Sequence, residues 1–218
     1  NAHGGIVDDL LVYCESESIY LLVVNASNMA KDMAWLAGHA RGFDIKICDA
    51  SLETSLLAVQ GPKAAEAMQS LTEVNLADMA YYTYTWGRFA GVDGVLISAT
   101  GYTGSGGVEL YIPQGKAPQV WDAILEAGQS FGIEPAGLAA RDTLRLEMGF
   151  CLYGNDIDDS TSPLEAGLGW ITKFTKPFTN SEALLAEKTR GVSRRLVGFH
   201  LVERGVPRQG YPITNAAG

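Results

Sequence analysis

The stretch Val95-Leu-Ile-Ser-Ala-Thr-Gly-Tyr-Thr-Gly-Ser-Gly-Gly-Val-Glu-Leu-Tyr-Ile112 decides the fold class. Its two ends, residues 95–100 and 108–112, are rich in β-branched and aromatic side chains, which predicts two strands. Glycines at positions 101, 104, 106 and 107 supply the positive φ angles that a hairpin connection needs. The stretch therefore predicts an antiparallel pair of strands.

The rest of the chain alternates between strand-like and helix-like runs without a regular β–α–β rhythm. Strand-like runs cover residues 6–13, 18–25, 45–47, 56–59, 82–89, 168–172 and 196–202. Apolar residues at helical spacing predict helices near 29–40, 62–71, 117–129, 138–148 and 181–188, with Asn25 and Asn28 as candidate N-caps of the first. We therefore expect an α+β fold with largely antiparallel sheets and flanking helices.

Composition excludes several kinds of protein. The formal net charge of −9 over 218 residues argues against nucleic-acid binding, which needs clustered Lys and Arg. Cys14, Cys48 and Cys151 form an odd set without a Cys-x-x-Cys pair, so we expect free thiols and neither a disulfide framework nor a metal site. No apolar run approaches a membrane span.

Asp8 and Asp9 interrupt the first strand-like run. Side chains alternate along a strand, so the two carboxylates point to opposite faces that are otherwise apolar. A carboxylate beside buried carbon needs a positive or hydrogen-bonding partner. Either both lie at a strand edge and accept local hydrogen bonds, or one of them faces a pocket that binds a basic nitrogen.

Glu109 interrupts the apolar pattern of the strand that follows the glycine-rich turn. The turn leads into a strand rather than a helix, so it is neither a phosphate loop nor a dinucleotide fingerprint. Glu109 either faces solvent or binds a ligand.

Arg141 and Arg145 lie one helical turn apart and could hold carboxylates in a forked geometry. A solvated ion-pair face over Asp142, Arg145 and Glu147 is the alternative. The acidic loop over residues 153–159 does not have calcium-loop spacing, so we predict no metal there.

Taken together and in this order, these motifs resemble the T proteins of the glycine cleavage system, which are aminomethyltransferases. The resemblance spans nearly the whole chain. The matching segments are Gly4–Tyr13, Val23–Ala26, Val59–Pro62, Thr100–Gly104, Gly137–Asp142, Leu144–Glu147, Leu152–Asp156, Ser162–Leu164 and Gly169–Trp170.

The resemblance implies a three-domain cloverleaf fold around a folate channel. It implies transfer of the aminomethyl carbon from the lipoylated H protein to tetrahydrofolate, which releases ammonia and forms 5,10-methylenetetrahydrofolate. Asp9 matches the catalytic carboxylate, and Glu109 matches the acid that binds the donor-rich pterin edge. The remaining site residues that it implies are Tyr13, Asn25, Tyr102 and Arg141.

Two positions depart from the family pattern. Ser105 and Gly106 replace an acidic pair, and Phe150 replaces a Tyr found in some relatives. Two rivals share the fold: the folate domain of a dimethylglycine- or sarcosine-oxidising enzyme, and a non-enzymatic folate-binding iron–sulfur maintenance protein. The second has a Lys-Gly-Cys loop, where this chain has Cys151-Leu-Tyr-Gly-Asn-Asp156.

The resemblance also implies a domain division and a truncation. We expect residues 1–175 to form the folate-binding region, as two intertwined subdomains divided near residue 50. We expect residues 176–218 to hold a linker helix and the start of a C-terminal β domain. Both ends look cut, so we expect this piece to be inactive by itself. Bacterial cytoplasm and mitochondrial matrix both fit the sequence.

Overall fold

The structure is a computed structural model that describes residues 1–208 and 210–215. The chain forms two compact units. One is Val7–Asp158, and the other combines Asn1–Ile6 with the chain from Asp159 onward. This division differs from the expected boundary at residue 175, which concerns the domains of a longer family fold and stays a prediction. Each unit is described by itself below.

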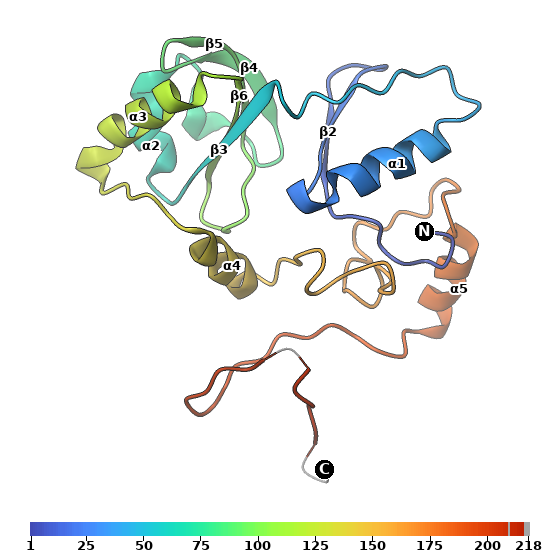
Figure 1. The fold of residues 1–218 in the computed structure, drawn as a ribbon. Helices are drawn as coiled ribbons and strands as arrows, with labels where there is room; N and C mark the ends of the chain where they lie inside the picture. The colour runs from blue at the N-terminus through green and yellow to red at the C-terminus, as the bar shows by residue number, and fades with distance from the viewer. Residues whose placement is uncertain (209, 216–218) are drawn as a thin grey trace. The chain divides into compact units, whose positions relative to one another are not determined.

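A four-stranded sheet forms the centre of the larger unit (Figure 1). Its strands are β3 (Thr54–Gln60), β4 (Tyr84–Phe89), β5 (Val92–Ser98) and β6 (Gly107–Pro113), in the order β3-β6-β5-β4. All three pairings are antiparallel, and β5 and β6 are the pair joined by the glycine-rich turn. The predicted hairpin and the α+β class with antiparallel sheets are therefore confirmed.

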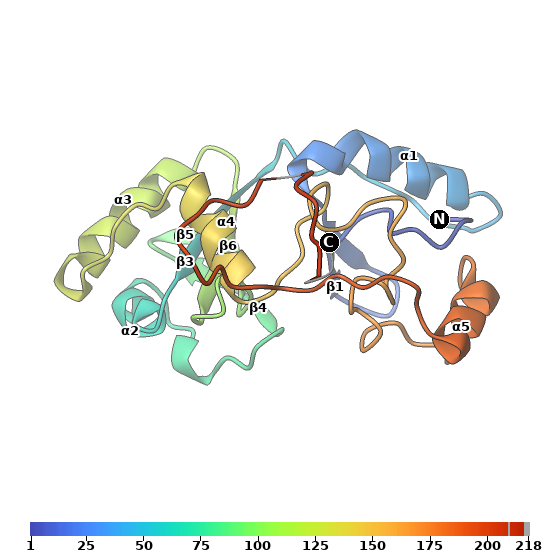
Figure 2. The same cartoon turned by 90° about the horizontal axis from the view of Figure 1, so that it is seen from below.

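Helices cover one face of this sheet. Val108, Leu110 and Ile112 of β6 point to that face and are fully or almost fully buried. They pack in one core with residues of α2 (Ala64–Met68) and α3 (Ala117–Gly128). Figure 2 shows both helices on the same side of the strands. Short 3-10 turns at Gln69–Leu71, Leu76–Asp78 and Gln129–Phe131 complete this layer.

The opposite face of the sheet carries polar residues and the second apolar cluster. Tyr111 and Leu96 point to this face and pack against Tyr13. Tyr13 lies on β1 (Leu11–Cys14), which pairs antiparallel with β2 (Tyr20–Val23) as a separate two-stranded sheet. The chain then continues through a 3-10 turn (Ala26–Asn28) into α1 (Met29–His39), and α4 (Leu138–Glu147) lies later in the same unit.

The smaller unit contains α5 (Ser181–Arg190) and mostly irregular chain. The Ile6 amide donates to the Thr161 carbonyl at 3.0 Å, which ties the N-terminal segment to the later one. Arg194 is paired with Glu165, with Nε 2.8 Å from Oε1. The described residues of both units include no helix with the length and apolar character needed to cross a membrane.

Three predicted strands are wrong. Residues 45–47 are irregular and exposed, and residues 168–172 form turns in which the Ile171 and Thr172 amides donate to Leu168. Residues 196–202 form no ladder with the described part of the chain, in which the Leu196 amide donates to the Glu165 carbonyl at 2.9 Å. Residues 209 and 216–218, within the expected start of a β domain, lie outside the described part.

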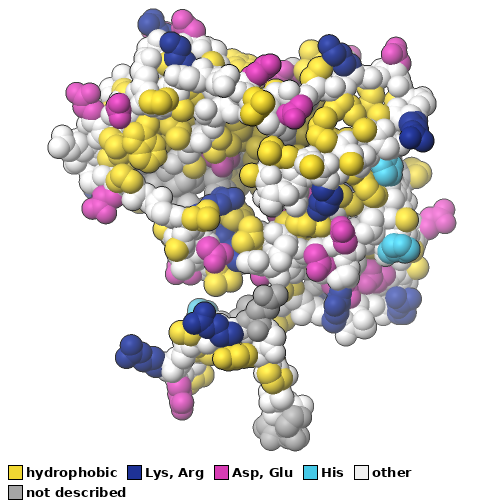
Figure 3. All heavy atoms as spheres, viewed as in Figure 1, with side chains coloured by type: hydrophobic (Ala, Val, Ile, Leu, Met, Phe, Trp, Pro, Cys, Tyr) yellow, Lys and Arg dark blue, Asp and Glu magenta, His cyan; other side chains and the backbone are white. Residues whose placement is uncertain are grey.

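Charged side chains are dispersed. Figure 3 shows Lys and Arg scattered among Asp and Glu on the face drawn, with hydrophobic side chains exposed between them.

Candidate functional site

Asp8 is held by the two asparagines that follow β2. Its Oδ1 accepts hydrogen bonds from Asn25 Nδ2 at 2.8 Å and from Asn28 Nδ2 at 2.6 Å. Asn25 Nδ2 also donates to the Asp9 carbonyl at 3.0 Å, so both of its amide hydrogens are used. Asn25 and Asn28 occupy the N-cap positions of the 3-10 turn and of α1, as predicted, but neither side chain makes a capping hydrogen bond. They position the acidic pair instead.

Asp32 of α1 is the further partner of Asp8. It is 4% exposed, and neither of its oxygens has a donor partner among the described residues. Burial, and next the hydrogen bond with Asp8, raise the pKa of Asp32 to about 6. Burial also favours a higher pKa for Asp8, but hydrogen bonds from Asp32, Asn25 and Asn28 outweigh it and lower that pKa. A proton on Asp32, donated to Asp8, satisfies both groups.

Asp9 lies just before β1 with its side chain exposed. Desolvation by the surrounding protein, and next the charge of Asp8, raise the pKa of Asp9. Burial is also the main cause of the raised pKa values of Tyr82, Tyr102 and Cys151, and the charge of Asp9 adds to each. The charge of Asp9 therefore acts on these three side chains, whereas the Asp8 carboxylate is hydrogen-bonded to its own partners.

Glu109 lies on β6 directly opposite Ser98 of β5. Thr100 donates its hydroxyl hydrogen to Glu109 Oε2 at 2.5 Å. Behind Thr100 lie the buried side chains of Ser98 and Tyr13, and Tyr13 donates to Ser98 at 3.0 Å. Glu109 is half-buried, so it is neither the solvated strand residue of the alternative hypothesis nor enclosed in the core. Tyr13, expected to line a pocket, is itself buried in this layer.

Tyr82 is influenced by the charges of both carboxylates, Asp9 and Glu109. The charges of Asp9 and Glu109 both contribute to its raised pKa, after burial and after its neighbour Tyr81. Its φ angle is 65°, in the left-handed region that is unusual for a bulky residue. Backbone strain of this kind concentrates at functional sites. Sequence reasoning did not single out Tyr82, because nothing in its local pattern signals a positive φ.

The glycine-rich turn is anchored at its base by Gln60. Gln60 Nε2 donates to the carbonyls of Thr100 and Val108, both at 3.1 Å, and Thr103 donates to Gln60 Oε1 at 3.2 Å. A Cβ on Gly101 would lie 1.8 Å from Gln60 Oε1, so only glycine fits beside this side chain. The turn thus sets the position of Tyr102, which it carries outward from the sheet.

Tyr102 is surrounded on both sides of its ring. The guanidinium of Arg141 lies 4.3 Å from the ring centroid, and Phe150 stacks at 5.8 Å between centroids. The Tyr102 hydroxyl donates to the Cys151 carbonyl. Because that hydroxyl is used, Tyr102 presents its ring edge and the Arg141 cation rather than a free hydroxyl.

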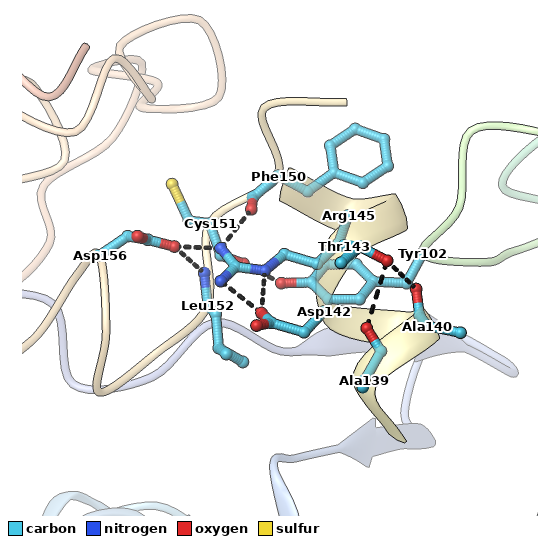
Figure 4. Close-up of polar contacts among 10 residues, drawn as sticks. All are labelled: Tyr102, Ala139, Ala140, Asp142, Thr143, Arg145, Phe150, Cys151, Leu152 and Asp156. Atoms are coloured by element: carbon cyan, nitrogen blue, oxygen red, sulfur yellow. Dashed lines mark hydrogen bonds and ion pairs between the residues drawn. The ribbon is translucent and has the colours of Figure 1, made fainter. Parts of the chain in front are cut away.

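Arg145 ties α4 to the loop that follows it (Figure 4). Its Nε and Nη2 reach Asp142 Oδ1 at 2.9 and 2.6 Å, and its Nη1 donates to Asp156 Oδ2. Nη1 also donates to the Phe150 carbonyl at 3.2 Å, and Asp156 Oδ2 accepts from the Leu152 amide at 2.9 Å. Arg145 is 4% exposed, so the alternative of a solvated ion-pair face is wrong for this residue.

The structure therefore brings the predicted residues together within one unit, but in two different roles. Asp9 and Arg141 are exposed and Glu109 and Tyr102 are half-buried, while Tyr13 is buried and Asn25 holds the Asp9 backbone. Sequence reasoning missed Thr100, Ser98 and Asp32. Period-2 alternation across the hairpin places Ser98 and Thr100 on the face of Glu109, which was the available signal.

Comparisons with known proteins agree on one family. The family model described as the GCVT N-terminal domain matches residues 1–176. An aminomethyltransferase of Flavobacterium psychrophilum is 59% identical over 218 residues, covering 100% of this chain and 60% of that protein. One from Bacteroides fragilis is 58% identical over 221 residues, covering 100% of this chain and 61% of that protein.

A solved structure shows the same similarity in three dimensions. The crystal structure of the glycine cleavage system aminomethyltransferase T from Bartonella henselae superposes with a TM-score of 0.79 at 35% identity. The match covers 89% of this chain and 52% of that chain. The chain thus spans about 60% of the length of the curated relatives that it matches.

Proposed function

Because the chain belongs to the GCVT family, the aminomethyltransferase T proteins of the glycine cleavage system, we propose that its protein is a tetrahydrofolate-dependent aminomethyltransferase. Its substrates are tetrahydrofolate and the aminomethyl group carried on the lipoyl arm of the H protein. Its products are 5,10-methylenetetrahydrofolate, ammonia and the dihydrolipoyl arm. The relatives named above are bacterial, which favours the bacterial cytoplasm as the site of action.

The observation that carries this proposal is the pair of carboxylates, exposed Asp9 and half-buried Glu109, whose charges both act on Tyr82. Two acceptors set apart in one unit suit a ligand with a donor-rich head and a basic nitrogen further along. The Asp8 carboxylate cannot serve as the ligand-facing group in place of Asp9, because it is already hydrogen-bonded to two asparagine amides and to Asp32.

Glu109 fits the pterin edge. A carboxylate accepts at both oxygens, and the amino and ring N–H groups of a pterin are donors. Thr100 occupies Oε2. Oε1 has no hydrogen-bond partner among the residues that the structure describes, so it is available to a ligand. Arg141 offers an exposed guanidinium fork beside the Tyr102 ring, a geometry that suits a carboxylate.

In this proposal Asp9 supplies the negative charge that stabilises the transfer step. A fixed carboxylate stabilises positive charge that develops as the one-carbon unit moves, and it orients the group that receives this unit. Its raised pKa reflects the partial desolvation that strengthens such an interaction. The Asn25 amide holds the Asp9 backbone, so the carboxylate is aimed from a fixed segment.

The test compares Asp9→Asn with its neighbour Asp8→Asn in the product of the complete reading frame that contains these residues. We expect Asp9→Asn to lower the rate of methylenetetrahydrofolate formation at least 100-fold, on the order of an electrostatic contact to a reacting group, with an unchanged melting temperature. Asp8→Asn should lower the melting temperature and spare most activity. Equal activity losses with native-like melting in both variants would contradict the assignment.

A further inference from the structure

Four hydroxyl groups form one continuous chain that ends at Glu109. The hydroxyl oxygens of Tyr111 and Tyr13 are 3.1 Å apart, and Tyr13 donates to Ser98 at 3.0 Å. The Oγ atoms of Ser98 and Thr100 are 2.9 Å apart, and Thr100 reaches Glu109 Oε2 at 2.5 Å. All four hydroxyl residues are buried, so solvent does not compete for these hydrogen bonds.

The chemistry of the Glu109 carboxylate determines where the Thr100 hydroxyl hydrogen goes. A carboxylate has no hydrogen to give, so the single hydroxyl hydrogen of Thr100 goes to Glu109. The Thr100 hydroxyl is also oriented as a donor toward Ser98 Oγ at 2.9 Å, but its one hydrogen goes to the ionised carboxylate, the stronger acceptor. Tyr13 donates to Ser98, which leaves the Tyr13 oxygen to accept from Tyr111.

Tyr111 suits the first position in this chain. Burial, and next the hydrogen bond to Tyr13, raise the pKa of its phenol far above the ordinary value, so it stays protonated and donates. Tyr111 thus donates to Tyr13 and Tyr13 to Ser98, while Thr100 donates to Glu109. Charge-assisted and cooperative hydrogen bonds then favour one position of the carboxylate.

We propose that Thr100 is a positioning residue for Glu109: it holds Oε2 and thereby aims Oε1 at the ligand's donor groups. This inference rests on the proposed function, in which Glu109 binds the pterin edge of tetrahydrofolate. Without the Thr100 hydroxyl, the half-buried Glu109 side chain has other rotamers to sample, and a ligand must order it on binding. The buried Thr100 hydroxyl contacts Glu109, Ser98 and Tyr13, and of these only Glu109 faces the proposed ligand, so the effect of Thr100 passes through Glu109.

The experiment measures tetrahydrofolate binding by calorimetry in the product of the complete reading frame. Thr100→Val keeps the side-chain shape and removes the hydroxyl, and we expect it to raise the Kd about tenfold. Thr100→Ser restores the hydroxyl and should bring the Kd within about twofold of the unmodified protein. Thr85→Val, on β4 of the same sheet and outside the hydroxyl chain, is the matched control and should leave the Kd unchanged.

A double substitution separates positioning from a direct or purely structural role. If Thr100 acts through Glu109, adding Thr100→Val to Glu109→Gln should weaken binding no further than Glu109→Gln does alone. Independent, multiplying effects would overturn the proposal, and so would an unchanged Kd in Thr100→Val. Should Thr100→Val fail to fold, Thr100→Ala removes the same hydroxyl with a smaller side chain and should raise the Kd about tenfold; an unchanged Kd there overturns the proposal equally.

The same data show whether the role of Thr100 is wrong or the proposed function itself is wrong. If Glu109→Gln weakens binding but Thr100→Val does not, the role of Thr100 is wrong and the proposed function stands. If the unmodified protein does not bind tetrahydrofolate, the proposed function fails and the role of Thr100 fails with it.

Discussion

Asp32 holds its carboxyl group where an ionised form is poorly tolerated. The side chain is almost fully buried, its nearest acidic partner is Asp8, and neither oxygen receives a hydrogen bond. An unpaired buried charge costs several kcal/mol in the absence of a partner. Below about pH 6 protonation of Asp32 removes that cost and gives Asp8 a further donor, while Asp8 keeps the charge.

This arrangement predicts a specific pH dependence. The pKa of Asp32 is raised above its ordinary value of 3.8 to about 6, so its contribution to stability is fully present below pH 3.8 and is lost as the pH rises through 6. Asp32→Asn cannot ionise and still offers a donor to Asp8. We expect the variant to gain about 1–2 kcal/mol in unfolding free energy, relative to the unmodified protein, between pH 5 and pH 8.

Urea unfolding of both proteins at the two pH values measures this difference. Lys31, whose charge lowers the Asp32 pKa, is present in both proteins and so cancels in the comparison. The lowered pKa of Asp8 has the opposite sign and acts below pH 3.8, outside this window. A relative stability that does not change between pH 5 and pH 8 would contradict a titration of Asp32 near pH 6.

The adjacent residues Asp8 and Asp9 show what a local sequence pattern can predict and what it cannot. Period-2 alternation predicted that Asp8 and Asp9 have different surroundings, and their partners do differ. It could not identify those partners, because Asn28 and Asp32 reach Asp8 only once α1 has packed beside the strand segment. The pairing depends on tertiary structure, which no local spacing encodes.

At the scale of elements, Arg145 joins α4 to the loop at Asp156. Its side chain is 5% exposed, against 25% for Asp156 and 53% for Asp142. Removing one partner from a buried ion pair leaves an uncompensated charge, whereas an exposed ion pair contributes little. We therefore expect Asp156→Asn to lower the unfolding free energy by about 1–3 kcal/mol and Asp142→Asn by less than about 1 kcal/mol.

Chemical denaturation of the two variants checks this order. The substitutions are chemically matched, and they differ in burial and in the Leu152 amide that Asp156 also accepts. Because this loop carries Cys151, whose carbonyl accepts from Tyr102, Asp156→Asn should also loosen the Tyr102 ring. Equal losses from both substitutions, or a larger loss from Asp142→Asn, would refute this account of the ion pairs.

Elements that form their own local contacts were predictable, and those that need a distant partner were not. The helices α1, α3, α4 and α5 lie close to the predicted ranges, and the β5–β6 hairpin follows from its glycines. Residues 196–202 have strand composition, yet they pair with no other strand in the described part of the chain. Strand propensity depends on pairing and burial, so composition alone overestimates such segments.

The same reasoning applies to the candidate site. The family motifs indicated Asp9, Glu109, Tyr102 and Arg141, and all four lie in one compact unit, where their role in a folate site stays a prediction. The motifs did not indicate why Glu109 keeps a fixed position, because the hydroxyl chain combines residues of β1, β5 and β6 with Thr100 just beyond β5. Several segments have to pack before that chain exists.

At the scale of the whole molecule, the outward groups of the site are open to water. Asp9, Tyr82 and Arg141 are exposed in this chain, which spans about 60% of the length of its curated relatives. A charge that stabilises a reacting group acts far more strongly where water is excluded. Within these residues Asp9, Tyr82 and Arg141 keep exposed surface, although neighbouring protein already desolvates Asp9 and Tyr82 in part.

We therefore expect the 218-residue piece to fold its larger unit and to be nearly inactive. With aminomethylated H protein and tetrahydrofolate as substrates, its turnover should fall at least 100-fold below that of the complete reading frame, since positioned charge loses most of its effect in water. Near-ultraviolet circular dichroism provides the control, because the Tyr13, Tyr84 and Tyr111 cluster should keep its ordered signal in the piece. An ordered piece with turnover close to that of the complete protein would mean that residues 1–218 already exclude water from the reacting groups, and that the exposed positions of Asp9 and Arg141 do not represent the working site.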